Sequence, residues 1–322
     1  MKVLVTDRFS SEALAKLKSR SKLEVAQSAS FLPSADELKD TSALIIRSRT
    51  KINAEILAQA PMLKVIVTST SGFDHIDFAA TQKHSVTVMH TPEANAQSAA
   101  ELTWLLALAC ARKFTQANAQ LKKGEWNREL LAGNTLSGKT YGIVGLGRIG
   151  SRVAKFAAAF GMDVIAFDPY VEPEAFARAH AARTSVEELF RTADFVSLHV
   201  PATPETKKMI NFRALEGASS DLILVNTSRG DVINEPELIK ALEQKLIKAV
   251  GLDVFASEPL APSSPLLKMP QVVLSPHVGA TTVEAFAASS SEAATKIIDF
   301  FENGRTSDVL PPKTSWFSSM PT

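Results

Sequence analysis

Three short polar segments each follow an apolar run, and their side chains could together move a proton and a hydride on a small acid. They are Thr227-Ser228-Arg229-Gly230, Asp253 to Glu258, and Ser275-Pro276-His277. A guanidinium can hold a carboxylate and polarise a carbonyl, and an imidazole can donate the proton that the developing alkoxide needs. A neighbouring carboxylate orients an imidazole and favours its charged form. We therefore expect Arg229 and His277 to serve hydride transfer at a 2-keto acid, with Glu258 rather than Asp253 as the acidic partner.

Each of these residues also has a plainer interpretation. Arg229 alone is equally consistent with an exposed turn residue, and Glu258 with a solvated loop acid before Pro259. The three segments nevertheless follow predicted parallel strands, and ligands of doubly wound sheets bind beyond the carboxyl ends of such strands. Their joint occurrence therefore favours a catalytic site.

A glycine-rich segment, Gly145-Leu146-Gly147-Arg148-Ile149-Gly150, lies between a predicted strand and a predicted helix. In this context glycines let the backbone approach a pyrophosphate, and the exposed amides of the helix start attract its charge. Arg148 can add a cationic contact. Asp168 follows by about 20 residues, where a carboxylate binds the adenosine ribose and repels a 2′-phosphate, so NAD is favoured over NADP. The alternatives are a turn without a ligand and a solvated aspartate.

The elements that must position these groups alternate between strand and helix along the chain, which predicts parallel sheets covered by helices. One helix is expected over Asn95 to Lys123, opened by a capping pair of Ser98 and Glu101, and another from about Thr282 to Glu302. Strands are expected at 2–6, 43–46, 63–67, 86–89, 140–144, 163–167, 195–198, 222–226, 249–253 and 272–274.

The series breaks at the first long helix, and the last helix could return to the first domain. We therefore predict an α/β protein with two doubly wound parallel-sheet domains. A discontinuous substrate-binding domain is expected at 1–97 and 285–322, and an NAD-binding Rossmann domain at 98–284.

Composition restricts the class of partner. The 35 Lys and Arg nearly balance the 34 Asp and Glu, so no global field favours nucleic acid or an anionic membrane. The single cysteine, Cys110, excludes an internal disulfide framework and thiolate metal clusters. The start of the chain lacks the pattern of a secretory signal, and the longest apolar run, 102–111, is too short for a membrane span. No metal is expected, and the protein is expected in the cytoplasm.

The remaining histidines are expected to lie on the surface or to have hydrogen-bond partners, although His199 could line the adenosine side. They are His75, His84, His90, His180 and His199.

At Gly145 to Gly150, Asp168, 227–230, 251–259 and 275–277 the chain resembles the D-isomer-specific 2-hydroxyacid dehydrogenases over nearly its whole length. The resemblance implies a catalytic triad of Arg229, Glu258 and His277, a flavodoxin-like substrate domain, and a homodimer joined mainly through the cofactor domains. The implied cofactor-binding residues are Ser71, Gly145, Gly147, Arg148, Ile149, Gly150, Asp168, Val200, Pro201, Thr227, Ser228, Asp253 and Gly279.

Within that family the chain is most similar to the D-3-phosphoglycerate dehydrogenase branch, through Ile46-Arg47-Ser48, Ser71-Gly72-Phe73-Asp74 and Gly124-Glu125-Trp126 to Arg128. The implied substrate residues are Arg47, Ser71, Gly72, Arg128 and Arg229, with Arg47 and Arg128 at phosphate-binding positions. At a third such position stands Thr68, which lacks the bidentate grip of a guanidinium.

The favoured substrate pair is therefore D-3-phosphoglycerate and 3-phosphohydroxypyruvate, and a hydroxypyruvate or glyoxylate reductase, or a reductase of another 2-keto acid, is the alternative. From the few residues after Pro312, we expect the regulatory extension of longer relatives to be missing. A hypothesis of a different class is an NAD-sensing interaction protein, and a third is that Trp316-Phe317 anchors a partner or a second subunit.

Overall fold

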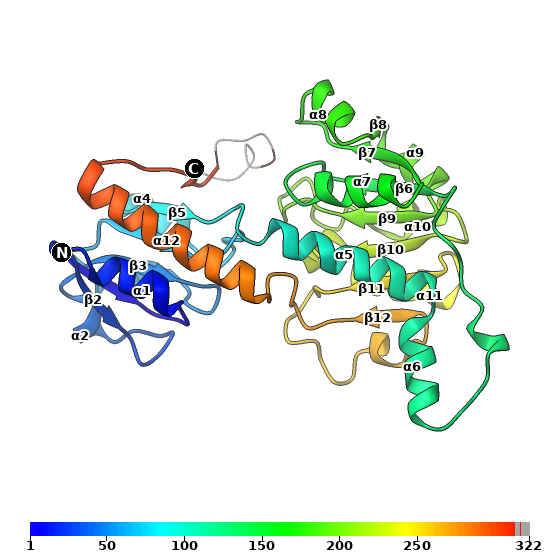
Figure 1. Ribbon diagram of the computed structural model, residues 1–322, viewed down its shortest axis with the longest axis horizontal. Coiled ribbons are helices and arrows are strands. Elements are labelled where there is room, and N and C mark those ends of the chain that lie inside the picture. Colours follow the sequence, from blue (N-terminus) through cyan, green and yellow to red (C-terminus); the bar gives the residue numbers. More distant parts are fainter. Residues whose placement is uncertain (313–315, 317–322) are drawn as a thin grey trace. The chain divides into compact units, whose positions relative to one another are not determined.

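The computed structural model describes residues 1–312 and Trp316 (Figure 1). The chain forms two compact units, Met1–Ala96 with Ala280–Thr322, and Gln97–Gly279. The chain leaves the second unit at Gly279, a few residues before the expected boundary at 284. Phe317, which belongs to the hypothesis of an anchoring tail, lies outside the described residues. Within the described part of the chain, no helix is both long and apolar enough to cross a membrane.

The first unit is built on a sheet with the strand order β13-β5-β4-β3-β1-β2. The five strands β1 to β5 are parallel in the order 2-1-3-4-5, which is the flavodoxin-like arrangement. Strand β13 pairs antiparallel to β5, with Val309 opposite Met89. Its strands are β1 (Lys2–Val5), β2 (Glu24–Gln27), β3 (Thr41–Ile46), β4 (Val65–Thr68), β5 (Thr87–His90) and β13 (Val309–Leu310). Its helices are α1 (Ser11–Lys18), α2 (Ala35–Leu38), α3 (Ala54–Ala58), α4 (Phe78–Lys83) and α12 (Val283–Asn303).

Helices cover both faces of this sheet. Helices α1 and α12 lie side by side on one face, where Leu17 and Ile297 pack against Val3 and Ile45 (Figure 1). Residues of α2, α3 and α4 pack against the alternate strand residues, such as Leu44, on the other face. Because both faces are covered, the central strands are continuous apolar runs, which is why the sequence predicts them well.

The second unit contains a parallel sheet with the strand order β12-β11-β10-β9-β6-β7-β8. From β8 to β11 this is the 3-2-1-4-5-6 order of the Rossmann fold, extended by β12. Its strands are β6 (Thr140–Val144), β7 (Asp163–Phe167), β8 (Ala182–Arg183), β9 (Phe195–Leu198), β10 (Ile223–Asn226), β11 (Ala249–Leu252) and β12 (Val272–Leu274). Its α-helices are α5 (Ala96–Ala111), α6 (Phe114–Lys122), α7 (Gly150–Ala159), α8 (Pro173–Arg178), α9 (Val186–Thr192), α10 (Phe212–Glu216) and α11 (Glu235–Glu243). Short 3₁₀ turns lie at η1 (Glu129–Leu131), η2 (Gly230–Val232) and η3 (Pro265–Lys268).

The core of the second unit joins α5, α7 and α8 to one face of its sheet through residues such as Ala107, Val153 and Phe176. The ring of Trp104 on α5 contacts that of the buried Tyr141 on β6 in a tilted arrangement, with centroids 5.6 Å apart. The buried Cys110 belongs to the same cluster, and burial raises the pKa of its thiol to about 12. The prediction of two doubly wound parallel-sheet domains is confirmed.

Two predictions about the first long helix are wrong. The expected helix over Asn95 to Lys123 is two helices, because Lys113 adopts a left-handed conformation with φ of 49° between α5 and α6. The expected capping pair does not form. Helix α5 begins earlier, at Ala96, and the Ser98 hydroxyl donates instead to the carbonyl of Gly279 at 2.7 Å. Glu101 accepts from the side chain of Gln97.

Three strands were not expected from the sequence. Strand β2 lies at the edge of its sheet and includes Glu24 and Gln27, so it lacks an apolar run. Strands β8 and β13 have two residues each and depend on pairing with β7 and β5. Such short edge strands have no periodicity of their own in the sequence.

Candidate active site

The glycine segment forms the turn between β6 and α7, and each of its three glycines has a different environment. Gly145 has φ of 94°, and a Cβ there would lie 2.7 Å from the carbonyl oxygen of His199. A Cβ on Gly150 would lie 2.1 Å from the carbonyl oxygen of Gly145. A Cβ on Gly147 would meet nothing within 4 Å. The fold itself therefore requires the first and third glycines, whereas the second keeps the backbone open to a ligand.

This turn fits the phosphates of a dinucleotide. Helix α7 starts at Gly150, and its N-cap residue Ile149 provides no side-chain cap. The uncapped amides and the partial positive charge of the helix start suit an anion. Arg148, the neighbouring cation, is exposed. Val200, two residues beyond β9, lies against this turn, since its Cγ1 would be 2.9 Å from a Cβ on Gly145, and Pro201 follows it.

Asp168 follows β7 and is only 3% exposed. Its carboxylate accepts from the backbone N–H of Leu146 at 2.8 Å and from that of Tyr170 at 3.0 Å. Each oxygen thus already holds one amide and keeps lone pairs for a further donor. The sequence predicts a ribose ligand here but does not reveal this second task, in which Asp168 fixes the glycine turn.

Asn226, which the sequence did not indicate as a site residue, shapes the loop that carries Arg229. Its Oδ1 accepts from the backbone N–H and the hydroxyl of Ser228, at 3.0 and 2.8 Å. Its Nδ2 donates to the carbonyl of Arg229 at 2.9 Å, and Arg229 Nη1 donates to the carbonyl of Ser228. The Thr227 hydroxyl lies 2.6 Å from that of Thr103 on α5. Asn226 is fully buried, so these bonds fix the loop firmly.

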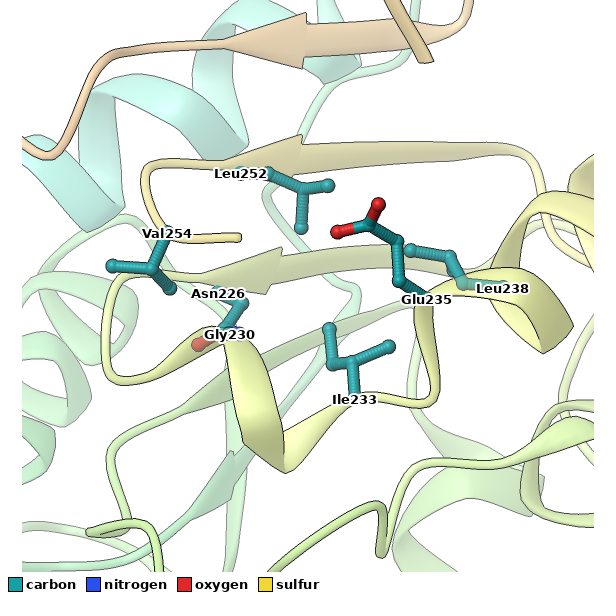
Figure 2. A pocket seen from close by; sticks show the side chains of 7 residues that line it. All are labelled: Asn226, Gly230, Ile233, Glu235, Leu238, Leu252 and Val254. Carbon is teal, nitrogen blue, oxygen red and sulfur yellow. The ribbon is translucent and has the colours of Figure 1, made fainter. Parts of the chain in front are cut away.

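The Arg229 loop packs directly on the loop that leads to Glu258. A Cβ on Gly230 would lie 1.9 Å from the carbonyl oxygen of Phe255, so only glycine permits this approach. Below the contact lies a small pocket, in which the Glu235 carboxylate points between Leu238 and Leu252 (Figure 2). Glu235 accepts from the backbone N–H of Ala256 at 3.1 Å. The other residues that line the pocket are Asn226, Gly230, Ile233 and Val254.

Glu258 and His277 form a hydrogen-bonded pair. His277 Nδ1 lies 2.7 Å from one carboxylate oxygen of Glu258, and the other oxygen accepts from the backbone N–H of Phe255 at 3.1 Å. The side chains remain 50% and 37% exposed, respectively. The bond at Nδ1 leaves Nε2 as the ring nitrogen for a substrate, which is the arrangement of an oriented acid–base histidine.

Asp253 has a different role from Glu258. It is 1% exposed, and its carboxylate accepts from the Ser275 hydroxyl at 2.6 Å, from the Val278 amide at 2.9 Å and from the Gly279 amide at 2.8 Å. Its carbonyl accepts from the His277 amide at 2.8 Å. Asp253 thus fixes the backbone on both sides of His277, whose φ is 51°, and does not bond to the imidazole.

The other residues predicted to bind substrate are Ser71, Gly72 and Arg47 in the first unit and Arg128 in the second. In the first unit, the carbonyl of Ser71 accepts from His90 Nδ1 at 2.8 Å, and that of Gly72 accepts from the Thr70 hydroxyl at 2.8 Å. Arg47 follows β3 and donates to the Ser289 hydroxyl. In the second unit, Arg128 is an exposed residue just before η1.

Two of the other expectations concern metals and histidines. No group of three or more His, Cys, Asp or Glu side chains suited to a metal occurs in the part of the chain that the structure describes. His199 is partly exposed. Burial lowers the pKa of its imidazole to about 3, and its Nε2 lies 2.8 Å from the Ser197 hydroxyl.

Comparison with known proteins identifies the family. Residues 104–279 match the model described as the NAD-binding domain of D-isomer specific 2-hydroxyacid dehydrogenases. The chain belongs to this family. The glycine turn, the Arg229 loop and the Glu258–His277 pair all lie within the matched residues, which therefore form an NAD-binding domain.

Relatives within the family carry different names. The chain is 40% identical over 299 residues to the D-3-phosphoglycerate dehydrogenase of Methanocaldococcus jannaschii, covering 92% of this chain but 57% of that protein. It is 38% identical over 301 residues to the hydroxypyruvate reductase of Thermotoga maritima, covering 92% and 97%. The chain thus spans little more than half the length of the phosphoglycerate dehydrogenases that it matches.

Solved structures have the same fold. A protein from Thermus thermophilus is 36% identical, with a TM-score of 0.86 and coverage of 96% of this chain and 100% of the other. The D-lactate dehydrogenase of Aquifex aeolicus, solved with NAD and lactic acid, is 28% identical, with a TM-score of 0.82 and coverage of 92% and 95%.

Proposed function

We propose that this protein is an NAD-dependent dehydrogenase of small D-2-hydroxy acids, with Arg229, Glu258 and His277 as its catalytic residues. The main support is the 2.7 Å bond between His277 Nδ1 and Glu258, in a loop that Asp253 holds by buried hydrogen bonds. A positioned imidazole backed by a carboxylate is suited to general acid–base catalysis. Membership of a dehydrogenase family supports the same chemistry.

In the direction of reduction, Arg229 binds the substrate carboxylate and draws electron density toward the carbonyl oxygen at C2. His277 gives its Nε2 proton to that oxygen as the alkoxide develops, and Glu258 keeps the ring oriented. NADH, when bound, supplies the hydride to C2. In oxidation the same groups work in reverse, with His277 taking the hydroxyl proton.

We propose that the cofactor is held at the glycine turn, with its pyrophosphate at Gly147 and the start of α7 and its ribose at Asp168. The open space at Gly147 supports the phosphate position. A carboxylate at the ribose disfavours a 2′-phosphate, so NADH should be preferred to NADPH. Equal kcat/KM values for the two cofactors would contradict the assignment of Asp168.

The favoured substrate pair is D-3-phosphoglycerate and 3-phosphohydroxypyruvate. The similarity to proteins named D-3-phosphoglycerate dehydrogenase supports it, with Arg47 and Arg128 as phosphate ligands and Ser71 and Gly72 as backbone contacts. Reduction of hydroxypyruvate or glyoxylate is the alternative. It is supported by the Thermotoga maritima relative named hydroxypyruvate reductase, whose length the chain almost fully covers.

The test follows NADH absorbance with the purified protein against 3-phosphohydroxypyruvate, hydroxypyruvate, glyoxylate, pyruvate and 2-oxoglutarate, ranked by kcat/KM. His277→Ala should lower kcat by about 10²- to 10⁴-fold, the usual effect of losing general acid–base catalysis. The matched control is His84→Ala, since His84 is an exposed histidine of the other unit. A His277 variant with nearly full turnover would remove that residue from the mechanism, and no turnover by the wild type would favour an NAD-sensing protein.

We also propose a cytoplasmic homodimer. Family resemblance supports the dimer, and the one cysteine, buried at position 110, is consistent with a reducing compartment. Light scattering coupled to size-exclusion chromatography would give a mass of twice 34.7 kDa for a dimer, and a mass of one chain would contradict the proposal.

A further inference from the structure

Arginines cluster at the carboxyl ends of β1 and β3 in the first unit. Arg8 follows β1, and Arg47 and Arg49 follow β3. Strands β1 and β3 are neighbours, whereas β2 lies on the other side of β1. The chain therefore leaves these two strands toward opposite sides of the sheet, and doubly wound sheets bind ligands at such a point.

One of the three cations is already neutralised. Asp7, whose side chain is 4% exposed, accepts from Arg49 Nη2 at 2.5 Å and from Arg49 Nε at 3.0 Å. Burial opposes ionisation of Asp7, but the hydrogen bonds from Arg49 and from the Arg8 amide outweigh it and lower its pKa. The Arg49 guanidinium also lies over the Phe31 ring, 5.1 Å from its centroid. Asp7 and Arg49 therefore form a closed pair with little charge left for a ligand.

The other two cations share one aromatic ring. The guanidinium of Arg8 lies 5.6 Å from the ring centroid of Phe286 on α12, and that of Arg47 lies 5.4 Å from the same centroid. Arg47 is further held by the Ser289 hydroxyl at 3.3 Å. Both guanidinium groups thus make cation–π contacts with one ring, while the charge of Arg8 repels that of Arg47.

The charge of Asp7 offsets this repulsion in part, because a single carboxylate stands against three arginines. Burial lowers the pKa of Arg47, Asp7 opposes the decrease, and the charges of Arg8 and Arg49 add to it. Because Asp7 is engaged with Arg49, the Arg8–Arg47 pair keeps a net positive charge. An anion with two negative charges would neutralise it and could accept several charge-assisted hydrogen bonds.

We propose that Arg8 and Arg47 together bind a phosphate group, and that Arg8 is a residue that determines specificity for a phosphorylated acid. The identification of this group as the substrate phosphate rests on the proposed function. Thr68 ends β4 in the same sheet, but it is fully buried and its hydroxyl is bonded to Thr70 and His75. Arg8 supplies from β1 the second cation that Thr68 does not supply from β4.

The first experiment measures binding of inorganic phosphate to the full chain by calorimetry, without cofactor or substrate. Arg8→Gln and Arg47→Gln should each weaken binding by about tenfold or more, the effect of losing a charge-assisted interaction. Arg20→Gln is the matched control, because it removes the same charge from an exposed arginine of the same unit that is paired with Glu302. The proposal would be overturned if the Kd for phosphate changed equally in Arg8→Gln and Arg20→Gln, or if it changed in neither variant.

The second experiment compares steady-state kinetics. Arg8→Gln should raise the KM for 3-phosphohydroxypyruvate at least about tenfold more than the KM for hydroxypyruvate. An equal change in both values would overturn the role of Arg8 in specificity while the proposed activity stands. If phosphate binding depends on Arg8 but the protein reduces no 2-keto acid, the phosphate site is supported and the proposed function is contradicted.

Discussion

Gly147 offers a prediction in which stability and cofactor binding should change in opposite directions. A Cβ at this position meets nothing within 4 Å, and its φ lies outside the left-handed region. Gly147→Ala should therefore cost no contacts in the folded protein. It should stabilise the fold by about 0.4–1 kcal/mol, because alanine restricts the unfolded chain.

Cofactor binding should fall in the same variant. The added methyl group would stand where the backbone is proposed to approach the pyrophosphate. The loss of one charge-assisted hydrogen bond costs roughly 1.5–3 kcal/mol, which corresponds to a Kd for NADH about 10- to 150-fold higher. Gly150→Ala should behave differently, because its Cβ would lie 2.1 Å from the Gly145 carbonyl and destabilise the fold itself.

Urea unfolding and titration of NADH fluorescence would measure the two effects. Gly217→Ala is a matched control, since the nearest atom to its Cβ is the Arg213 carbonyl oxygen at 3.9 Å, at the end of α10. If Gly147→Ala binds NADH within about twofold of the wild type, the pyrophosphate does not approach this glycine and the reasoning fails. A variant as unstable as Gly150→Ala would show that the space at Gly147 is not open.

Three further predictions concern the loops that carry the proposed catalytic residues, and the partly exposed His199. Gly230→Ala should abolish most activity, since its Cβ would lie 1.9 Å from a backbone carbonyl; an active variant would show that the loop contact is dispensable. Glu235→Ala should lower kcat about several-fold by freeing a backbone amide in the loop that leads to Glu258. Glu235→Gln should keep the wild-type kcat. The control is Glu237→Ala, which frees the backbone amide of Phe212 instead; equal losses of kcat in all three variants would refute the role of Glu235. Burial lowers the pKa of His199 to about 3, so the folded protein binds fewer protons than the unfolded chain, and stability should fall from about pH 6.5 downward by up to ~1.4 kcal/mol per pH unit. Urea midpoints at pH 7, 6 and 5 should show a weaker decline in His199→Gln, and equal slopes would contradict the assignment.

The local sequence determined much of the fold and indicated which polar side chains follow the strands. Strands β6, β7, β9 and β12 begin and end where the sequence predicts them, because buried parallel strands are short apolar runs bounded by turns. Helix α12 is likewise evident, with Thr282 as its N-cap. Since the carboxyl ends of parallel strands share one edge, Arg229, Glu258 and His277 could be selected before their contacts were known.

Only the tertiary structure determined which hydrogen bonds hold the loops that carry Arg229, Glu258 and His277. Backbone amides more than 20 residues away donate to Glu235 and Asp253. Asn226 donates to a nearby carbonyl that only this loop conformation brings within reach. A sequence records that a carboxylate or an amide is present but not which N–H it accepts from, because that depends on how two strand ends meet. The capping pair at Ser98 failed for this reason, as the hydroxyl found the Gly279 carbonyl instead.

The arginine cluster illustrates the same limit. Arg8, Arg47 and Arg49 are visible in the sequence, yet nothing in their spacing separates the arginine that is neutralised from the two that are not. Asp7 selects Arg49, and the ring of Phe286 gathers the other two from a helix near the other end of the chain. Charge pairing and ring contact depend on distances of a few ångströms, which only the packing of α12 against this sheet sets.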